Sequence, residues 1–402
     1  MAGKTEVAED IKNSALQIQP DLVELRRDFH RHPELSGKEV ETARRLEGIL
    51  KDLGLSVQTG IAGCGLVATV EGGLPGRTAL VRADMDALPI VEQSGVDFSS
   101  QREGVMHACG HDIHMTVAIG AARLLQDRRK TLKGKVKFLF QPSEEVPPGG
   151  ALPMIESGVL DDPQVDAAFA LHVYPGIPVG SIGVRDGVLF SQADDFDVEI
   201  LGKGGHGAMP HQGNDAIAAA CEFVSALQIA RSRRIDPVEP SVISIGRIEG
   251  GTQRNVLCPR VTIEGTARAA NPEIAALYPE LINDVVAGVA STFGVEINVK
   301  YETGYPPVNN HTGINDFVRR ASVSQCGDDK VVTLKEPMLA GEDFAYFTRR
   351  VPSAMFLLGI GNPDIEAVYP WHHPKFRADE RALAIGAGIF AAAVSDYCGH
   401  DV

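Results

Sequence analysis

The stretch "MHACGHDIHM", residues 106–115, concentrates side chains that bind metal ions or transfer protons. It holds three histidines, a cysteine and an aspartate, and the apolar run 116–125 follows directly, as at the start of a buried helix. Within a helix, Cys109 and His111 would point away from each other, so they can share an ion only from a turn. Gly110 between them makes that turn easy. A Cys-x-His pair alone is most often structural, so a metal site needs further donors.

Further donors follow the predicted strands, at the point where each strand ends. In open α/β sheets, ligands bind beyond the carboxyl ends of the strands, so donors at several strand ends meet at one edge. We expect this edge to include residues 106–115. The donors in question are Asp84 and Asp86 after "TALVR", Glu144 and Glu145 after "KVKFLF", His172 after "AAFAL", and His372 and His373 in the loop after 353–361.

Each of these donors also has a purely structural interpretation. Asp84 and Asp86 could cap a following helix, and His172 could be a core histidine. Glu144 and Glu145 could end a solvated loop, but adjacent carboxylates repel each other, and a buried pair needs a cation. One of the two can then bind the metal while its neighbour acts as a base. The joint occurrence of donors at separate strand ends favours a metal site.

The chemistry of the donors indicates which ions they would bind. One thiolate with imidazoles and a carboxylate suits borderline divalent ions such as Zn, Mn, Ni or Co. The donors exceed the four that one tetrahedral site needs, which favours two ions with a bridging ligand. His107 and His114 are assigned to packing or to contacts with the ligands, and Asp112 to a helix N-terminus or an imidazole partner.

Composition and charge exclude several classes of function. The formal charge is −15, from 38 basic and 53 acidic residues, which argues against a nucleic-acid-binding protein. No apolar run approaches the roughly 18 residues of a membrane span, and the first 20 residues read as a polar lead-in to a helix rather than a secretory signal. The six cysteines are scattered without a CxxC motif, as in a protein with reduced thiols. We therefore expect a cytoplasmic protein that binds neither nucleic acid nor membrane.

The order of predicted elements indicates an α/β protein of two domains. Outside residues 191–304, strands alternate with helices, which predicts a mixed, largely parallel sheet flanked by helices. Within 191–304 the order is strand, helix, two strands, helix, strand, the ferredoxin-like βαββαβ arrangement. We predict a discontinuous domain, residues 1–190 and 305–402, with the βαββαβ domain 191–304 inserted into it.

The motifs, in their order along the chain, resemble a known enzyme family. The sequence is similar to the hippurate hydrolase and indoleacetyl-amino-acid amidohydrolase family, from about residue 20 to 395. That family is a branch of the aminoacylase/carboxypeptidase superfamily of dinuclear metallohydrolases, with a zinc-exopeptidase-like catalytic domain. The motifs are "DFHRHPELSGKE", "RADMDALPI", "MHACGHDIHM", "QPSEE", "LHVYPG", "GGHGAMPH", "AGEDFAYF" and "HHPKF".

The resemblance implies a role for each donor in the larger domain. Cys109 would bridge two metal ions, where the wider superfamily uses an aspartate. His111 and His172 would complete the ligands of one ion, and Glu145 and His372 those of the other. Glu144 would be the general base, and Asp86 an orienting acid behind the metal site. Asp84 stands where other branches have a metal-binding histidine, so its role stays open.

The resemblance also implies that the inserted domain is a lid and dimerisation domain. His206 would reach toward the developing oxyanion, often from the partner subunit, although by itself it reads as a turn histidine. Asn255 and Arg268 would position the carbonyl and free carboxylate of the substrate, and Gly341 would lend a backbone N–H to that carboxylate. Taken alone, Arg268 reads as a surface arginine. A homodimer, or a higher assembly, is expected.

The predicted function is hydrolysis of the amide bond of a small N-acyl or N-aroyl amino acid by metal-activated water. A dipeptidase or carboxypeptidase could use the same dinuclear site on peptides. A third hypothesis is nucleophilic catalysis by Cys109 with a nearby histidine. A binding protein without activity is disfavoured, because every motif position expected to do chemistry is present.

Overall fold

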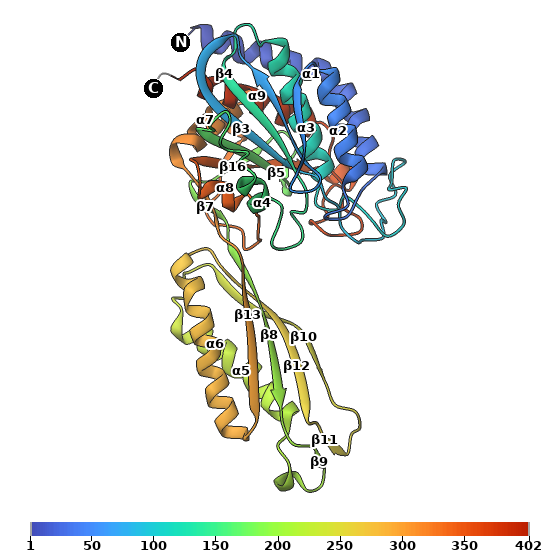
Figure 1. The fold of residues 1–402 in the computed structure, drawn as a ribbon, viewed down its shortest axis with the longest axis vertical. Helices are drawn as coiled ribbons and strands as arrows, with labels where there is room; N and C mark the ends of the chain where they lie inside the picture. The colour runs from blue at the N-terminus through green and yellow to red at the C-terminus, as the bar shows by residue number, and fades with distance from the viewer. Residues whose placement is uncertain (1, 401–402) are drawn as a thin grey trace. The chain divides into compact units, whose positions relative to one another are not determined.

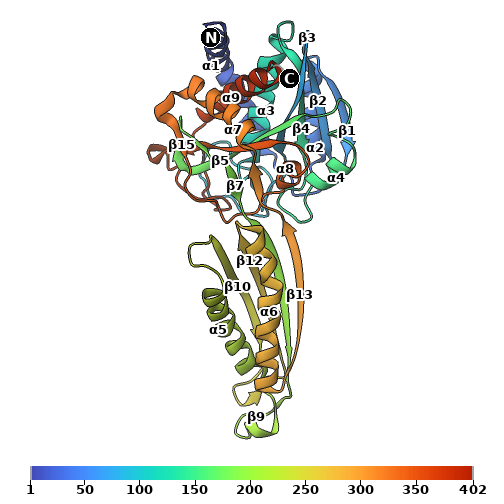
Figure 2. The ribbon, with the colours of Figure 1, turned by 90° about the vertical axis from the view of Figure 1, so that its left-hand side faces the viewer.

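The computed structural model describes residues 2–400, which form two compact units. Unit 1 contains the chain up to Gly187, Val308–Lys335 and the chain from Asp343 onward. Unit 2 contains Val188–Pro307 and Glu336–Glu342. Figures 1 and 2 show the elements of each unit in two views.

Unit 1 is built on an eight-stranded mixed sheet with the order β1-β2-β4-β3-β5-β16-β6-β15. The central pairs β4–β3, β3–β5 and β5–β16 are parallel, and β1–β2, β2–β4 and β16–β6 are antiparallel. The predicted α/β class with a largely parallel sheet is confirmed. The strands of this sheet are β1 Ser56–Ile61, β2 Gly65–Glu71, β3 Leu74–Asp84, β4 Lys133–Gln141, β5 Ala167–Pro178, β6 Ile182–Val184, β15 Val331–Thr333 and β16 Ser353–Gly361. In a separate two-stranded sheet, β14 Val308–Asn310 pairs with β7 Gly187–Phe190, which runs from unit 1 into unit 2.

Helices bury the central strands of this sheet. Every residue of β16 is buried, as expected for a parallel strand covered on both faces. Helices α3 and α9 pack on the sheet and on each other, and α1 packs on both (Figure 1). The helices of unit 1 are α1 Ala2–Arg31, α2 Val40–Asp52, α3 His111–Asp127, α4 Ala151–Glu156, α7 Thr312–Cys326, α8 Ala345–Thr348 and α9 Ala382–Cys398, with 3-10 turns η2 Asp328–Lys330 and η3 Pro363–Ile365.

The N-terminal helix corrects one prediction from the sequence. The first 20 residues were expected to be a polar lead-in, but they form most of α1. Ile11, Ala15, Ile18 and Leu22 are buried at spacings of three and four residues, so they form one apolar stripe. Because acidic and basic residues lie between these four, the composition of the segment does not reveal the apolar stripe.

Unit 2 has the predicted βαββαβ order. Its four-stranded antiparallel sheet has the order β10-β12-β8-β13, and α5 and α6 pack on it and on each other. Local sequence sets the helix ends: Asp215 accepts hydrogen bonds from Ile217 and Ala218 at the start of α5. The elements are β8 Gln192–Leu201, β9 Gly205–His206, η1 Pro210–Gln212, α5 Ala216–Arg234, β10 Ser241–Gly250, β11 Val256–Leu257, β12 Arg260–Ala269, α6 Pro272–Phe293 and β13 Glu296–Tyr305.

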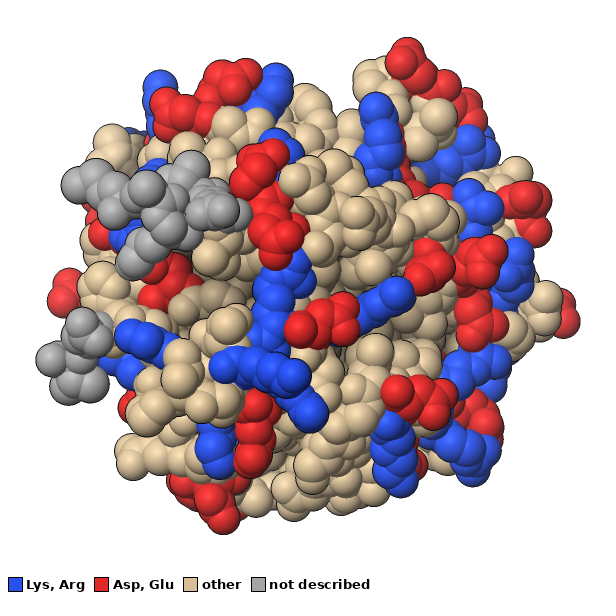
Figure 3. Space-filling model, turned by 90° about the horizontal axis from the view of Figure 1, so that it is seen from above, with Lys and Arg blue, Asp and Glu red and all other residues tan. Residues whose placement is uncertain are grey.

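One helix and one surface bear on the classes that the sequence excluded. By length and composition α6 is apolar enough to cross a membrane, which is weak support for a span because core helices pass the same test. Its buried residues, such as Tyr278 and Leu281, belong to the core of unit 2. Figure 3 shows lysines and arginines interspersed with acidic side chains over one face, as in a surface of mixed charge.

Candidate metal centre

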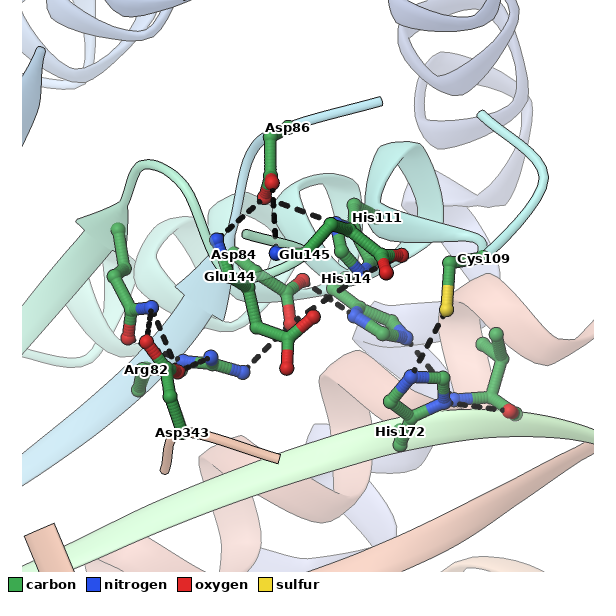
Figure 4. Close-up of polar contacts among 12 residues, drawn as sticks. Arg82, Asp84, Asp86, Cys109, His111, His114, Glu144, Glu145, His172 and Asp343 are labelled. Atoms are coloured by element: carbon green, nitrogen blue, oxygen red, sulfur yellow. Dashed lines mark hydrogen bonds and ion pairs between the residues drawn. The ribbon is translucent and has the colours of Figure 1, made fainter. Parts of the chain in front are cut away.

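The Cys-Gly-His stretch forms a tight turn at the start of α3. Gly110 precedes the helix with a φ of +88°, and His111 is the first helical residue. A Cβ at Gly110 would lie 2.4 Å from Cγ2 of Val173, so no larger residue fits without movement. The turn leaves Cys109 and His111 on one wall of the site (Figure 4), as the glycine between them indicated.

Four carboxylates reach the same edge of the sheet from β3 and β4. Asp84 is the last residue of β3 and lies opposite Gln141, the last residue of β4. Asp86 follows two residues later. After β4 the chain turns at Ser143, whose φ is +58°, and presents Glu144 and Glu145.

His172 occupies a position inside β5 rather than at its end, which corrects the predicted strand boundary. The strand continues to Pro178 and pairs there with β16. On the other side, the last pair of β5 with β3 is Ala170 with Arg82, and β3 ends two residues later at Asp84. The imidazole of His172 therefore lies level with the end of β3, and its Nε2 is 3.4 Å from Sγ of Cys109.

The structure brings the five predicted metal ligands into two sets that share one thiol. Cys109, His111 and His172 form the first set, whose ligand atoms all lie within 4.8 Å of one another. Cys109, Glu145 and His372 form the second set by the same measure. Cys109 thus lies in a bridging position between two donor groups. Glu144 joins His111 and Glu145 in a third set, as a further carboxylate beside both.

His372, rather than His373, faces the other donors. Its Nε2 lies 3.3 Å from Oε1 of Glu145, and its backbone N–H donates to the carbonyl of Ala108 at 3.0 Å. A left-handed φ of +61° at His372 turns its side chain toward this edge. His373 instead stacks on Tyr369, with ring centroids 4.7 Å apart.

Several donor atoms lack hydrogen-bond partners within the described part of the chain, and bound cations would take the place of such partners. Both ring nitrogens of His111 and Oε1 of Glu145 are buried without a hydrogen-bond partner among the described residues. Burial and the carboxylates of Glu145 and Glu144 raise the pKa of the Cys109 thiol well above its usual range. A bridging thiolate therefore requires positive charge beside it. Divalent ions would satisfy the unpaired donors and the thiolate together.

The charges at His111 and His172 point the same way. Burial lowers the pKa of His111, but the carboxylates of Asp84 and Asp86 outweigh it and raise that pKa to about 10. The same negative potential that holds a proton on His111 would hold a cation. Burial and the neighbouring His114 lower the pKa of His172 well below its usual value, so this ring is a neutral donor.

The other polar residues of 106–115 lie behind the ligands. Asp112 accepts a hydrogen bond from Arg26 at 2.8 Å and lies 2.8 Å from Nδ1 of His30. Burial raises the pKa of the Asp112 carboxyl, but Arg26 and His30 outweigh burial and lower that pKa. His114 lies 2.6 Å from Asp84 through Nδ1. His107 is buried with neither ring nitrogen hydrogen-bonded among the described residues.

A buried ion network beneath Asp84 was missed from the sequence. Arg82 donates to Asp84 at 2.6 Å and to Asp343 at 2.7 Å, and all three side chains are fully buried. Gln141 donates to both oxygens of Asp343, at 2.8 and 2.7 Å. The available signal was Arg82 itself, because a charged residue inside the apolar run "TALVRAD" requires a buried partner.

The predicted substrate-binding residues all belong to unit 2, where they form two groups. His206 on β9 pairs with Val256 on β11, next to Asn255, and accepts a hydrogen bond at Nδ1 from the N–H of Ala208 at 3.1 Å. The proton of a neutral His206 ring is then on Nε2, which is exposed as a donor.

The second group, Arg268 and Gly341, lies at the other end of the strands of unit 2. Arg268 pairs with Ala193 on β8 and donates to the carbonyl of Leu339 at 3.3 Å. A Cβ at Gly341 would lie 3.0 Å from Cβ of Ala193, so packing alone already favours a small residue there. The structure thus places Arg268 beside the segment that carries Gly341.

Comparison with known proteins decides the family. The model of the family described as "Peptidase family M20/M25/M40" matches residues 80–396, which is most of the chain. The chain belongs to this family. It is therefore a hydrolase that acts on amide bonds. Membership of the M20 family and the clustered donors both support the binding of divalent metal ions at this site.

Individual family members resemble the chain over nearly its whole length. N-acetyldiaminopimelate deacetylase of Priestia megaterium is 39% identical over 92% of this chain and 96% of the relative. Thermostable carboxypeptidase 2 of Saccharolobus solfataricus is 36% identical, over 95% and 96%. A crystal structure from Bacillus subtilis, described as a dinuclear metal-binding peptidase of the M20 family, has a TM-score of 0.82 at 35% identity and covers 95% of this chain and 99% of its own.

Proposed function

We propose that this M20 hydrolase cleaves the amide bond of small N-acyl or N-aroyl amino acids, releasing a carboxylic acid and an amino acid. Two divalent ions, Zn, Mn, Ni or Co, are its cofactors. The observation that carries the proposal is the position of Cys109 in both donor sets, with the ligand atoms of each set within 4.8 Å of one another. A dinuclear site needs a ligand that bridges its two ions, and a thiol shared by two donor sets can supply it as a thiolate.

The proposal assigns Cys109 to both ions and each of the other ligands to one. Cys109, His111 and His172 hold one ion, and Cys109, Glu145 and His372 hold the other. The ions supply an activated water and polarise the amide carbonyl when they are bound. The chain itself shields the first of these two sets from water, because all three of its members are buried, whereas His372 of the second set is exposed.

Glu144 is the general base of the proposal. Its carboxylate is buried and lies within 4.8 Å of the donor atoms of His111 and Glu145, beside the place where both would face an ion. It takes a proton from the attacking water and passes it to the leaving amine, so the same carboxyl serves as base and then as acid. Asp86 is the orienting acid, because it contacts the backbone of Glu144 and lies 3.4 Å from Nδ1 of the ligand His111 rather than at the reacting atoms.

A homodimer belongs to the proposal because His206 and Arg268 lie far apart within one chain. The partner of Arg268 on β8 is Ala193, while β9 with His206 follows the opposite end of β8, at Leu201. The eight residue-to-residue steps from Ala193 to Leu201 span about 27 Å of extended strand. One small substrate cannot reach both side chains of one subunit, so we propose that the His206–Asn255 group and the Arg268–Gly341 group that serve one substrate come from different subunits.

The substrate class is supported by the resemblance and by the relatives. The motifs favour aroyl and indoleacetyl amino acids, and the deacetylase relative favours acetylated ones. The second candidate function is that of a carboxypeptidase or dipeptidase at the same site, which the thermostable carboxypeptidase relative favours. Both candidates require the same ions and the same base.

Nucleophilic catalysis by Cys109 is disfavoured by the state of its histidine partner. Sγ of Cys109 and Nε2 of His172 are 3.4 Å apart, as in a thiol–imidazole pair. However, burial raises the pKa of this thiol and lowers that of this imidazole, so the proton stays on sulfur without a cation. A reactive thiolate–imidazolium pair needs both shifts in the opposite direction.

A cytoplasmic location completes the proposal. All six cysteines of the chain are free, and Cys109, Cys258 and Cys398 are buried. Free thiols in this number suit a reducing compartment, where the bridging thiolate would also be protected from oxidation.

The test is a substrate panel with metal-stripped protein reloaded with Zn, Mn, Co or Ni. Hippurate, N-acetyl and indoleacetyl amino acids are compared with dipeptides and C-terminal peptide substrates. The proposal expects acyl amino acids to give the highest kcat/KM and expects chelator to abolish turnover. A preference for peptides would replace it with the second candidate, and activity that survives metal removal would contradict both.

A further inference from the structure

The backbone of Val173 connects two buried histidines through its N–H and its carbonyl, which belong to two successive peptide groups. Its N–H donates to Nε2 of His114 at 3.0 Å. Its carbonyl accepts from Nδ1 of His172 at 2.9 Å and from Nε1 of Trp371 at 2.8 Å. Because β3 pairs with β5 only as far as Ala170, side chains take over the backbone groups of β5 beyond that point.

These contacts fix which nitrogen of each ring carries a proton. A backbone N–H only donates, so Nε2 of His114 accepts, and the proton of His114 is on Nδ1. That Nδ1 donates to Oδ1 of Asp84 at 2.6 Å, and Arg82 donates to Oδ2 of the same carboxylate at 2.6 Å. A carbonyl only accepts, so the proton of His172 is also on Nδ1, and Nε2 of His172 faces Sγ of Cys109.

The same contacts argue against a metal site built on Asp84. Asp84, His111 and His114 are close enough together to hold an ion. However, Nδ1 of His114 carries the proton that it donates to Asp84, and Nε2 of His114 accepts from Val173, so this ring has no lone pair left for a cation. The set therefore offers two donors rather than three, and each oxygen of Asp84 already accepts a hydrogen bond.

We propose that His114 is a positioning residue that, anchored by Asp84, holds the backbone of Val173 at its N–H and thereby fixes the Val173 carbonyl that sets the orientation and tautomer of the ligand His172. The inference rests on the proposed dinuclear function and assigns a role to Asp84, which occupies the place of a metal ligand without being one. The chain of contacts runs from Arg82 through Asp84 and His114 to Val173, entirely through buried side chains. Partners of this kind typically change metal affinity by about 10- to 100-fold when they are removed.

Two substitutions of His114 separate its two hydrogen bonds. The amide of His114→Asn lies near the former Nδ1 and can still donate to Asp84, but it does not reach the Val173 N–H. The amide of His114→Gln lies near the former Nε2, so its oxygen can accept from Val173 while the bond to Asp84 is lost. Thr116→Val is the matched control, because it removes a buried hydrogen bond, 2.7 Å to the carbonyl of Asp112, on the same helix.

The experiment measures the dissociation constants of Zn²⁺ at both sites, by competition between the stripped full-length protein and a chromophoric chelator. We expect His114→Asn to weaken one of the two ions about 10- to 100-fold, His114→Gln to weaken it less, and Thr116→Val to match the wild type. Wild-type affinity in His114→Asn, or a larger loss in His114→Gln than in His114→Asn, overturns the inference. A wild-type protein that binds fewer than two ions refutes the proposed function instead.

A second measurement needs no variant of His114 to fold. Long-range ¹H–¹⁵N spectra of histidine-labelled wild-type protein report which ring nitrogen carries a proton, and a His172→Gln spectrum assigns the His172 signals. The inference expects a proton on Nδ1 of both His114 and His172, with Zn²⁺ shifting Nε2 of His172. A proton on Nε2 of either ring, or Zn²⁺ at Nδ1 of His172, overturns it.

Discussion

Oδ1 of Asp86 accepts a hydrogen bond from the backbone N–H of Glu144, with an N–O distance of 3.0 Å. Its other oxygen accepts from the N–H of Glu145 at 3.0 Å and from the hydroxyl of Ser36 at 2.7 Å. One buried carboxylate thus holds the turn that carries both the proposed base and a proposed ligand. Since two adjacent N–H groups occupy both oxygens, the position of this turn depends on an ionised, two-sided acceptor.

Asp86→Asn tests that dependence. The amide keeps the size of the side chain but offers only one acceptor oxygen, so one of the two backbone bonds is lost. We expect kcat to fall about 10- to 100-fold, with KM changed much less. Ser36→Ala is the control, because it removes a bond to the same carboxylate and leaves both backbone bonds intact. Equal losses in the two variants would contradict a role in holding the turn.

Glu144→Gln separates proton transfer from metal binding. The amide cannot accept a proton from the attacking water, so turnover should fall by a factor of about 10² to 10⁴. Metal content, measured by plasma emission, should stay at the wild-type value. The neighbouring substitution Glu145→Gln should instead lose both metal and activity. Substantial turnover by Glu144→Gln would reject its assignment as the base.

Cys109→Ala tests the shared thiolate. Both donor sets lose a member at once, so we expect release of metal from both sites rather than from one. Cys398→Ala is the matched control, since that thiol is also buried but lies on α9. Retention of two ions per chain by Cys109→Ala would reject the bridging role, whatever the activity.

The fold class and the gathering of donors were predictable because both follow from local pattern. Strands that end in Asp84 and in the segment before Glu144 are visible as apolar runs, and parallel strands bring their ends to one edge. His172 was less accessible to this reasoning. Its strand continues past it, and only the end of the neighbouring strand β3 exposes it to the site.

The contacts between distant residues left no pattern to read. His114 bonds the backbone of Val173 across 59 residues, and Arg82 bonds Asp343 across 261. A backbone N–H is present at every residue except proline, so its choice of partner is invisible until the fold is known. Likewise, the turn that directs His372 rather than His373 toward the site depends on a left-handed backbone conformation at His372, which is not a glycine.

His107 provides a prediction of stability rather than of activity. Its ring is 1% exposed, and both nitrogens lack hydrogen-bond partners among the described residues. Burial lowers the pKa of His107 to about 4, from 6.5. As the pH falls below 6.5, the unfolded chain therefore binds a proton that the folded chain refuses, and the free energy of unfolding decreases until about pH 4.

His107→Leu removes this proton linkage together with two unpaired polar atoms. At pH 7.5 we expect the variant to be as stable as the wild type or more stable, because an unpaired buried polar group costs free energy. Between pH 7.5 and 5 the wild type should lose about 2 kcal/mol more than the variant. Urea unfolding at the two pH values measures the difference, and His211→Leu, an exposed histidine on η1, is the control. The same pH dependence in all three proteins would show that His107 is hydrogen-bonded or hydrated in solution, since only a dry, unpaired ring refuses the proton.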